Sequence, residues 1–566
     1  MEWAHSGPAV SLPLLAVLFL AVLVAGYTLY GRLIARQYRL DDAAVTPAVA
    51  LNDGVDFVPT RPFYLLGQHF SAIAAAGPIA GPIIACGLFG WLPSLLWIGL
   101  GVVLIGAVHD FSALVASIRH QGRSIAEIAK TTLGPRAWLA MLAFIWIALV
   151  YVIVAFADVT ATTFVGVTSD IEGETPFNKG GAVSAASALY LLLAIVMGLV
   201  QRRLAPPLWL VTLIFVPATL GVVGLGTVLS TWLLLDVRVW AVLIMAYCFV
   251  AALLPVWVLV QPRGYLGGFV LYLALAVGVG GIFFGGFDVV RDATTSAPLF
   301  GLEKSVFPFL FVTIACGACS GFHGLVCSGT TSKQIEREAH CRPIGYGGML
   351  LEGFVAFIAL ATIMVVTPEA TKGKGPGTIY GDGLARFLTV FTGEGSFRFA
   401  ATFGAMAFST FVFDTLDVAT RLGRYILQEL TGSTSRASAV AGTAATAGVP
   451  LVIFLSAGPN SFLTFWALFG TSNQLLAALT LLAVTVWLKR AGRRAWFTFW
   501  PMCFVMAITL WSLVGQTVTF LSTLHDAEGV FQFGNLANAL VAIALFALAA
   551  LLVVEAVRAV RKPVPG

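Results

Sequence analysis

A small set of ionisable side chains lies within or at the ends of long apolar runs of this chain. Charge is costly inside hydrocarbon, so such residues commonly mark a substrate or ion pathway. Burial also disfavours the charged form of a carboxyl group, which lets the group take up and release a proton near neutral pH. We therefore predict Asp110, Asp158 and Glu352 as proton-coupling residues, with a helix-helix hydrogen bond as the alternative for each. The remaining members of the set are His69, His109, His323, Asp414 and Asp417.

Two of these histidines, His69 and His323, lie at or near stretches whose composition favours an interrupted helix. A histidine in such a place can bind a carboxylate or relay a proton, and the alternative is a structural histidine with satisfied hydrogen bonds. Asp414 and Asp417 come shortly before Arg421 and Arg424 in the sequence. A surface salt bridge or a contact at a helix end is the better interpretation for these two carboxylates.

The first of the two stretches, residues 69–89, is apolar and long enough to cross a bilayer, yet it contains Gly-Pro twice. Proline lacks a backbone donor and clashes with the preceding turn, so Pro78 and Pro82 should break the helix at membrane depth. A helix that restarts at Pro82 would present free N–H groups and a positive dipole end, which suit a carboxylate. Interrupted helices of this kind form the substrate site of many secondary transporters.

The second stretch, residues 307–332, is rich in Gly, Ser and Thr and runs in the opposite direction through the membrane. Gly317, Gly321 and Gly324 each lower helix stability by about 1 kcal/mol relative to Ala, so the helix should unwind near Ser320 to Gly324. The alternative is that these small residues only allow close helix packing. The predicted substrate-binding residues of the two stretches are His69, Ser71, Gly77, Pro78, Gly81, Pro82, Ser320, Gly321, His323, Ser328 and Thr330.

A cluster of soft ligands also falls in the second stretch. Cys316, Cys319, His323 and Cys327 are spaced by three, four and four residues and would line one face of an unbroken helix. Such a face can hold zinc or an iron–sulfur cluster. Small packing residues are the favoured interpretation, because a break in the helix would scatter the face. No metal and no cofactor is therefore expected.

The composition shows what kind of scaffold must position these residues. Of the 566 residues, 59% are hydrophobic and 10% charged, where a soluble domain carries about 25% charged residues. The mean hydropathy is +0.93. We predict an all-α polytopic membrane protein, with room for about fifteen spans at roughly 20 residues each plus loops. No Walker-type nucleotide loop is present, which argues against an ATP-driven pump.

The charged loops between the apolar runs predict the orientation. Arg and Lys gather in every second loop, beginning with Arg32, Arg36 and Arg39, and such loops are cytoplasmic. The N-terminus is therefore predicted outside and the C-terminus inside. The predicted spans are 11–31, 69–89, 93–117, 137–167, 183–200, 206–231, 237–259, 265–286, 306–329, 346–367, 396–417, 437–456, 462–487, 496–520 and 534–557.

Two interrupted helices of opposite direction, separated by an odd number of spans, predict an inverted repeat. We expect a single transmembrane domain, 1–566, with an LeuT-like (amino-acid/polyamine-type) five-plus-five core; a seven-plus-seven repeat also fits the number of spans. Its parts would be an extra N-terminal span in 1–40, a first repeat in 62–260, a connecting span and loop in 261–305, a second repeat in 306–490, and additional spans in 491–566.

Several long motifs, in order along residues 30 to 490, resemble the carbon-starvation protein A family of bacterial inner-membrane transporters. The resemblance implies uptake of peptides under carbon limitation, or proton-coupled uptake of pyruvate as in close relatives. The chain departs from the family at Gln68, where many members have His, and at Cys319 and Cys327, which replace small residues. The motifs begin at Thr46 (TPAVALNDGVDFVPT), Gly67 (GQHFSAIA), Gly77 (GPIAGP), Gly106 (GAVHDF), Leu254 (LPVW), Phe307 (FPFLFVTIACGA), Ser320 (SGFH), Ser328 (SGTTSK), Ile344 (IGYGGMLLE) and Asp417 (DVATRLGRYILQEL).

The leading hypothesis is a proton-coupled symporter for a small carboxylate-bearing solute, in the bacterial inner membrane. Its partners would be a peptide or pyruvate, protons or another coupling cation, and the lipid bilayer; no nucleic acid and no enzymatic activity are expected. A channel and a membrane redox protein built on the Cys/His cluster are the alternatives.

Overall fold

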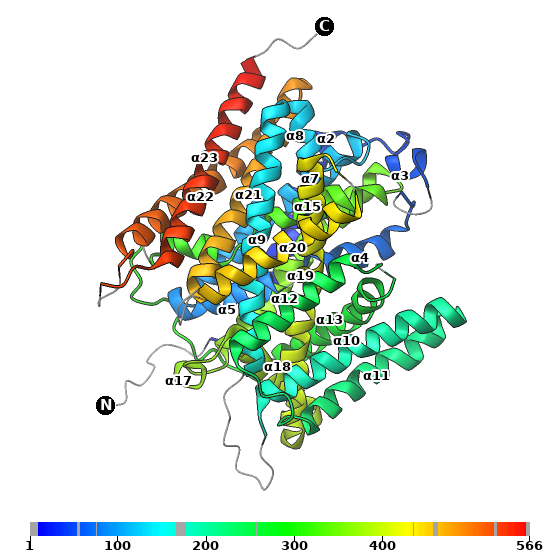
Figure 1. The fold of residues 1–566 in the computed structure, drawn as a ribbon, viewed down its shortest axis with the longest axis vertical. Helices are drawn as coiled ribbons and strands as arrows, with labels where there is room; N and C mark the ends of the chain where they lie inside the picture. The colour runs from blue at the N-terminus through cyan, green and yellow to red at the C-terminus, as the bar shows by residue number, and fades with distance from the viewer. Residues whose placement is uncertain are drawn as a thin grey trace.

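The computed structural model describes residues 10–53, 57–74, 76–165, 177–255, 257–302, 304–433, 435–456, 462–525 and 529–561, and these form an all-helical bundle (Figure 1). The helices of the N-terminal part are α1 (Leu12–Ala25), α2 (Gly31–Tyr38), α3 (Pro47–Ala50), α4 (Pro62–Ile73), α5 (Gly77–Phe89), α6 (Trp91–Gly101), α7 (Ala107–Arg119), α8 (Ile125–Thr132), α9 (Pro135–Val165), α10 (Lys179–Leu204), α11 (Leu208–Val228), α12 (Val237–Leu253) and α13 (Val260–Phe284).

The C-terminal part continues with helices of the same kind. They are α14 (Phe311–Thr313), α15 (Gly321–Gly329), α16 (Gly347–Met364), α17 (Pro368–Thr371), α18 (Pro376–Thr392), α19 (Phe397–Thr431), α20 (Arg436–Ser456), α21 (Phe462–Arg490), α22 (Trp496–Ser522) and α23 (Phe533–Arg561). Short π-helical segments, Gly26–Tyr30 and Val102–Gly106, join α1 to α2 and α6 to α7, so that each pair runs as one continuous helix.

Within the described residues, twelve helices are long and apolar enough to cross a membrane, and thirteen if the bent pair α4 and α5 is one span. The count of fifteen also needs α12, which has 17 residues, and the short helices α14 and α15. Fifteen spans therefore remain a prediction.

The helices differ in how they contribute to the core. About nine-tenths of the apolar parts of α19 and α21 are buried, whereas α1, α11 and α23 bury less than a third of theirs. Figure 1 shows α22 and α23 at one side of the molecule and α10 and α11 at the other. Helices that are apolar on all faces yet exposed are typical of contact with lipid, so the outer helices face the bilayer.

The first predicted interruption is placed differently by the structure. Helix α5 begins at Gly77, with Pro78 in its first turn and Pro82 inside the helix, and it meets α4 at an angle of 47°. The prediction that the helix restarts at Pro82 is therefore wrong. Proline costs nothing in the first turn, where its N–H would have no partner, and Pro82 removes only one hydrogen bond from a helix that is buried on nearly all sides.

The second predicted interruption also lies earlier than expected. Helix α14 ends at Thr313, residues Ile314 to Ser320 are not helical, and α15 begins at Gly321. Gly321 and Gly324 belong to the regular helix although glycine lowers helix stability. Glycine is required at both positions because the neighbouring helices leave no room for a side chain. A Cβ at Gly321 would lie 2.4 Å from the carbonyl oxygen of Asn473, and one at Gly324 would lie 3.2 Å from His109.

Candidate functional site

Three predicted residues meet between α7, α15 and α16. Nδ1 of His323 lies 2.9 Å from Oδ2 of Asp110, and Nε2 of His323 lies 3.1 Å from Oε2 of Glu352. The three side chains are at most 1% exposed. Each ring nitrogen of His323 thus lies close to a different carboxyl group, but only the contact with Asp110 is a hydrogen bond, and the oxygens of Glu352 have no hydrogen-bond partner among the described residues. We call Asp110, His323 and Glu352 the central triad.

Two more histidines surround the central triad. Nδ1 of His109 lies 2.7 Å from Oδ1 of Asp110, so both oxygens of this carboxylate are held by histidines. Nδ1 of His69 lies 2.9 Å from the hydroxyl of Thr331, and its Nε2 has no hydrogen-bond partner among the described residues. The structure therefore brings His69 and His323 into one buried region.

Close backbone packing brings these helices together. A Cβ at Gly106, one turn before Asp110, would lie 2.3 Å from the carbonyl oxygen of Ala318. A Cβ at Gly345, just before α16, would lie 2.9 Å from Cα of Phe111. Side chains at either position would push α7 away from the other two elements, and the central triad would lose its contacts.

The cysteine cluster predicted from spacing is not assembled. In the described part of the chain, the group close enough to share one ion is instead His69, Asp110 and Cys327, whose ligand atoms lie within 4.8 Å of one another. Cys316 and Cys319 do not join it, because the non-helical segment before α15 separates them from Cys327. Both oxygens of Asp110 are occupied by histidines, so the region is a hydrogen-bond network in this structure.

The predicted substrate-binding glycines line a tight contact between the two interrupted segments. A Cβ at Gly77 would lie 2.4 Å from Sγ of Cys316, and one at Gly81 would lie 2.7 Å from the carbonyl oxygen of Thr313. A Cβ at Gly317 would lie 3.5 Å from Cα of Pro78, an ordinary contact distance. The start of α5 and the chain after α14 are therefore in direct backbone contact in this conformation.

The three predicted hydroxyl residues of the second stretch, Ser320, Ser328 and Thr330, lie at the two ends of α15. At its N-terminal end, the Ser320 hydroxyl lies 3.3 Å from Oδ1 of Asn473, which also accepts the backbone N–H of Phe322 at 2.9 Å. At the other end, Ser328 donates to the carbonyl of Gly324, and Thr330 donates to that of Val326. Ser320 is thus near the interruption, and Ser328 and Thr330 are not. Asn473 was missed because nothing in the sequence of α21 links it to α15.

Asp158 stands apart from the central triad. It lies on α9, is 8% exposed, and its Oδ2 has no hydrogen-bond partner among the described residues. Among the described residues, no histidine or arginine forms an ion pair with Asp158. The structure therefore does not bring Asp158 together with Asp110 and Glu352.

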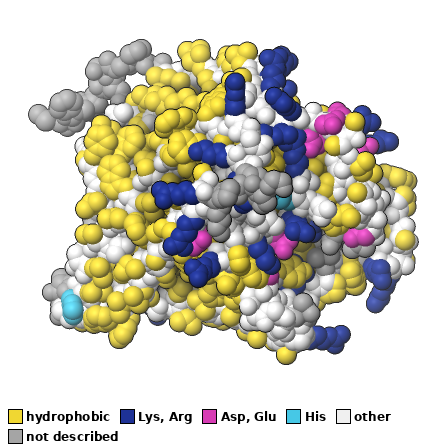
Figure 2. All heavy atoms as spheres, turned by 90° about the horizontal axis from the view of Figure 1, so that it is seen from above, with side chains coloured by type: hydrophobic (Ala, Val, Ile, Leu, Met, Phe, Trp, Pro, Cys, Tyr) yellow, Lys and Arg dark blue, Asp and Glu magenta, His cyan; other side chains and the backbone are white. Residues whose placement is uncertain are grey.

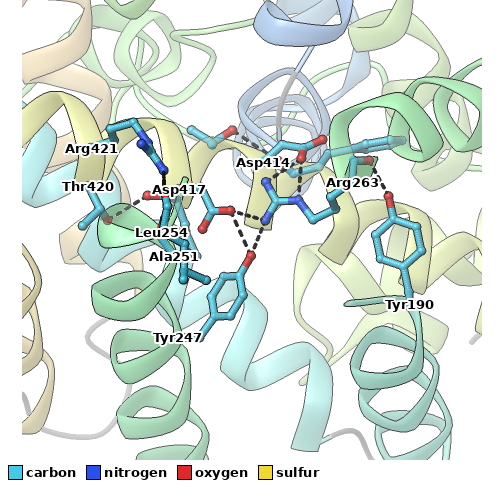
Figure 3. A network of polar contacts seen from close by, with 12 residues as sticks. Tyr190, Tyr247, Ala251, Leu254, Arg263, Asp414, Asp417, Thr420 and Arg421 are labelled. Atoms are coloured by element: carbon cyan, nitrogen blue, oxygen red, sulfur yellow. Dashed lines mark hydrogen bonds and ion pairs between the residues drawn. The ribbon is translucent and has the colours of Figure 1, made fainter. Parts of the chain in front are cut away.

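A second buried network, which we call the arginine cluster, was not predicted (Figure 3). Arg263 on α13 is 0% exposed, and its Nε donates to Oδ1 of Asp414 at 2.8 Å. Its Nη1 contacts Asp417 and the hydroxyl of Tyr247, and its backbone carbonyl accepts the hydroxyl of Tyr190 at 2.8 Å. The predicted spans 237–259 and 265–286 place Arg263 in a cytoplasmic loop between them, but it lies inside the bundle.

The partners of the two α19 carboxylates therefore differ from those expected. Arg421 and Arg424 follow at helical spacing but donate to backbone carbonyls, those of Ala251 and Leu254 from Arg421 and that of Ala252 from Arg424. These carbonyls end α12 and have no partner within the helix. Asp414 and Asp417 are left to neutralise Arg263, and Figure 3 shows the guanidinium between their carboxyl groups.

Comparison with known proteins adds independent findings. A family model described as carbon starvation protein CstA matches residues 11–372 and 368–512. The peptide transporter CstA of Campylobacter jejuni is 33% identical over 592 residues, with 91% of this chain and 82% of that protein covered. The peptide transporter CstA of Bacillus subtilis is 34% identical, with 84% and 85% covered. The pyruvate/proton symporter BtsT of Escherichia coli is 30% identical, with 94% and 84% covered.

Solved structures with similar chains include MhsT in complex with L-phenylalanine, at 13% identity and a TM-score of 0.47, with 87% of this chain and 98% of that chain covered. A mutant of the Eremococcus coleocola manganese transporter matches at 12% identity and a TM-score of 0.42, with 90% and 99% covered.

Proposed function

Because the chain belongs to the carbon starvation protein CstA family, we propose that it is a secondary active transporter of the bacterial inner membrane. Its substrate would be a peptide or a small carboxylate such as pyruvate, the solutes named for its relatives, and its energy source a proton gradient. Substrate would gain access from alternate sides through movement about the two interrupted segments, α4 with α5 and α14 with α15.

The central triad is the observation that carries this proposal. A neutral imidazole has one donor and one acceptor nitrogen. When His323 is neutral, it can donate to only one of Asp110 and Glu352, and the other contact needs a proton on that carboxyl group. The contact with Asp110, at 2.9 Å, is a hydrogen bond, whereas Oε2 of Glu352 lies 3.1 Å from Nε2 without hydrogen-bond geometry. Hydrogen bonds on both sides of His323 would require one proton beyond a neutral histidine and two carboxylates.

Loss of that proton would leave a nitrogen lone pair facing a carboxylate in a site that excludes water. An unpaired buried group of this kind is costly, so one contact would open. His323 lies on the first turn of α15, directly after the non-helical segment. Proton release would therefore weaken the hold of α15 on α7 or α16, and a proton would be coupled to movement of this helix.

The distribution of charge supports the proposed orientation. Figure 2 shows Lys and Arg side chains spread over the end of the molecule seen from above. In Figure 1 this end carries α2, α8 and the C-terminal end of α23. Exposed basic residues of these elements include Arg32, Arg36, Lys130 and Arg561. Positive loops face the cytoplasm, so we place this end inside.

Transport by purified protein in liposomes tests the proposal. Labelled pyruvate and labelled di- and tripeptides should accumulate above their outside concentration when the outside is acidic, and a protonophore should abolish accumulation. His323→Ala and Asp158→Asn should each stop proton-driven uptake while the folded protein remains in the membrane. Equilibration without accumulation would indicate a channel, and normal accumulation by both variants would refute these residue assignments.

A further inference from the structure

The arginine cluster contains two carboxyl groups and one guanidinium. Asp414 and Asp417 both contact the one guanidinium of Arg263. The two carboxyl groups differ in exposure, since the side chain of Asp417 is 1% exposed and that of Asp414 is 22% exposed. Asp417 is thus the fixed partner, and Asp414 is the partner at the accessible side.

Asp414 contacts the guanidinium of Arg263 through one of its two oxygens. Both Nε and Nη2 of Arg263 contact the same oxygen, Oδ1 of Asp414, at 2.8 and 2.6 Å. The Nε–Nη2 edge of a guanidinium matches the two oxygens of a carboxylate, and the two parallel bonds are stronger than bonds to one oxygen. A carboxylate that approached freely would therefore bind this edge better than Asp414 does.

Small and polar residues lie next to Asp414, where a ligand would have to enter. Gly267 of α13 lies against this carboxyl group, since a Cβ there would lie 3.0 Å from Oδ2 of Asp414, and its neighbour Gly268 is partly exposed. The hydroxyl of Thr410, one turn before Asp414, is buried without a hydrogen-bond partner among the described residues. Ser71 of α4, a predicted substrate-binding residue, lies 4.0 Å from where a Cβ at Gly268 would be.

From these contacts we propose that Arg263 binds the carboxylate of the transported solute and that Asp414 occupies this place when no solute is bound. The inference rests on the proposed transport function and names its substrate class: pyruvate and the C-terminus of a peptide share a carboxylate, which is the chemistry recognised here.

Binding would also link solute and proton. Three carboxylates around one guanidinium are unfavourable in a buried site, so Asp414 must turn away or take up a proton when the solute arrives. The titratable and charged groups that face Asp414 are Tyr190 on α10, Arg263 on α13 and Asp417 on α19, while Tyr247 and Cys248 on α12 face Asp417. Except for Arg263 none of these is a cation, so a proton on Asp414 is the available compensation.

The geometry of α4 connects this place to the central triad. His69 and Ser71 are two residues apart on α4, which turns their side chains to different faces of the helix. One face contacts Thr331 next to the triad, and the other approaches Gly268. Helix α4 therefore packs against both α13, which carries Arg263, and α15, which carries His323, and its movement would connect the two places.

Equilibrium binding to the purified full-length protein tests the inference. The probes are pyruvate and dialanine, each compared with its carboxamide, which lacks the carboxylate. Asp414→Asn should tighten binding of either acid by about tenfold, because the resident competitor is weakened. Asp417→Asn removes the same charge from the other side of the guanidinium and should not tighten it. Arg263→Lys keeps the charge but loses the two-pronged contact, and it should weaken binding of the acids by about tenfold or more.

Three outcomes would overturn the inference: equal tightening by Asp414→Asn and Asp417→Asn, equal affinity of the wild-type protein for acids and amides, or no binding of either acid. Should Arg263→Lys fail to fold, the comparison of the two aspartate variants still decides. Accumulation in liposomes without a preference for the carboxylate would overturn this inference and leave the proposed function standing. Selective binding of the acids without accumulation would support this inference and overturn the proposed function.

Discussion

At the scale of single residues, the protein places its charges in pairs that one proton can rearrange. Glu352 and Asp110 lie on different helices, and each contacts a different nitrogen of His323. A buried ion pair is weak evidence for stability, since desolvation offsets much of the attraction. A group of this kind inside an apolar bundle is better explained by a functional role.

Glu352→Gln should separate substrate movement from proton movement. A glutamine amide can donate or accept at His323, so the contact no longer depends on an extra proton. Exchange of labelled for unlabelled substrate should continue in liposomes, while accumulation driven by an acidic outside should disappear and the rate should lose its pH dependence. Glu555→Gln, on the peripheral helix α23, is the control and should behave as the wild type. Proton-driven accumulation by Glu352→Gln would contradict the role of the central triad.

At the scale of elements, glycine determines how closely the interrupted segments approach one another. Gly77 and Gly81 of α5 face Cys316 and Thr313 with no room for a Cβ, whereas a Cβ at Gly87, further along the same helix, would meet no atom within 4 Å. The first turns of α5 therefore pack against the chain around α14, whereas the face that carries Gly87 is open. Movement of α5 relative to the chain after α14 must break this contact.

Gly81→Ala should therefore destabilise the protein by about 1–3 kcal/mol, because the added methyl group overpacks a buried backbone contact. Gly87→Ala is the matched control on the same helix, and it should leave stability unchanged or raise it by about 1 kcal/mol, the difference in helix propensity. Thermal unfolding of both variants in detergent measures the difference. Equal midpoints for the two variants would show that α5 and the chain after α14 are not in close contact.

At the scale of the whole molecule, the charged end and the apolar flanks define how the protein lies in the membrane. Lys and Arg side chains gather at the end seen in Figure 2, which in Figure 1 carries α2, α8 and the last turn of α23. The helices α1, α11 and α23 bury less than a third of their apolar parts within the bundle. The chain between α13 and α14 would then lie at the opposite, outer end, where residues 292–295 are exposed.

Labelling of single added cysteines tests this orientation in intact cells. Thr294→Cys should react with a membrane-impermeant maleimide added from outside, because residue 294 is exposed and lies at the proposed outer end. Arg494→Cys should react only after the cells are permeabilised. The seven native cysteines are buried or half-buried, and the unmodified protein provides the background. The reverse pattern would show that the proposed orientation is inverted.

The sequence by itself determined the class of the protein and most of its long helices, since apolar runs and charged loops depend on neighbours along the chain. It also selected His69, Asp110, His323 and Glu352, because ionisable residues stand out in apolar surroundings. The family followed from long motifs, and the match over residues 11–372 and 368–512 confirms it.

Only the tertiary structure decided which of these residues meet. Asp110 and His323 are 213 positions apart, and Arg263 and Asp417 are 154 apart. No local pattern encodes such pairs, because they depend on which helix faces are pressed together by close backbone contacts such as those of Gly106 and Gly345. For the same reason the pattern of spans predicted a loop at residue 263 and a helix start at Pro82, and the sequence grouped Asp158 with Asp110 and Glu352, although the packing of the helices places Asp158 apart from them.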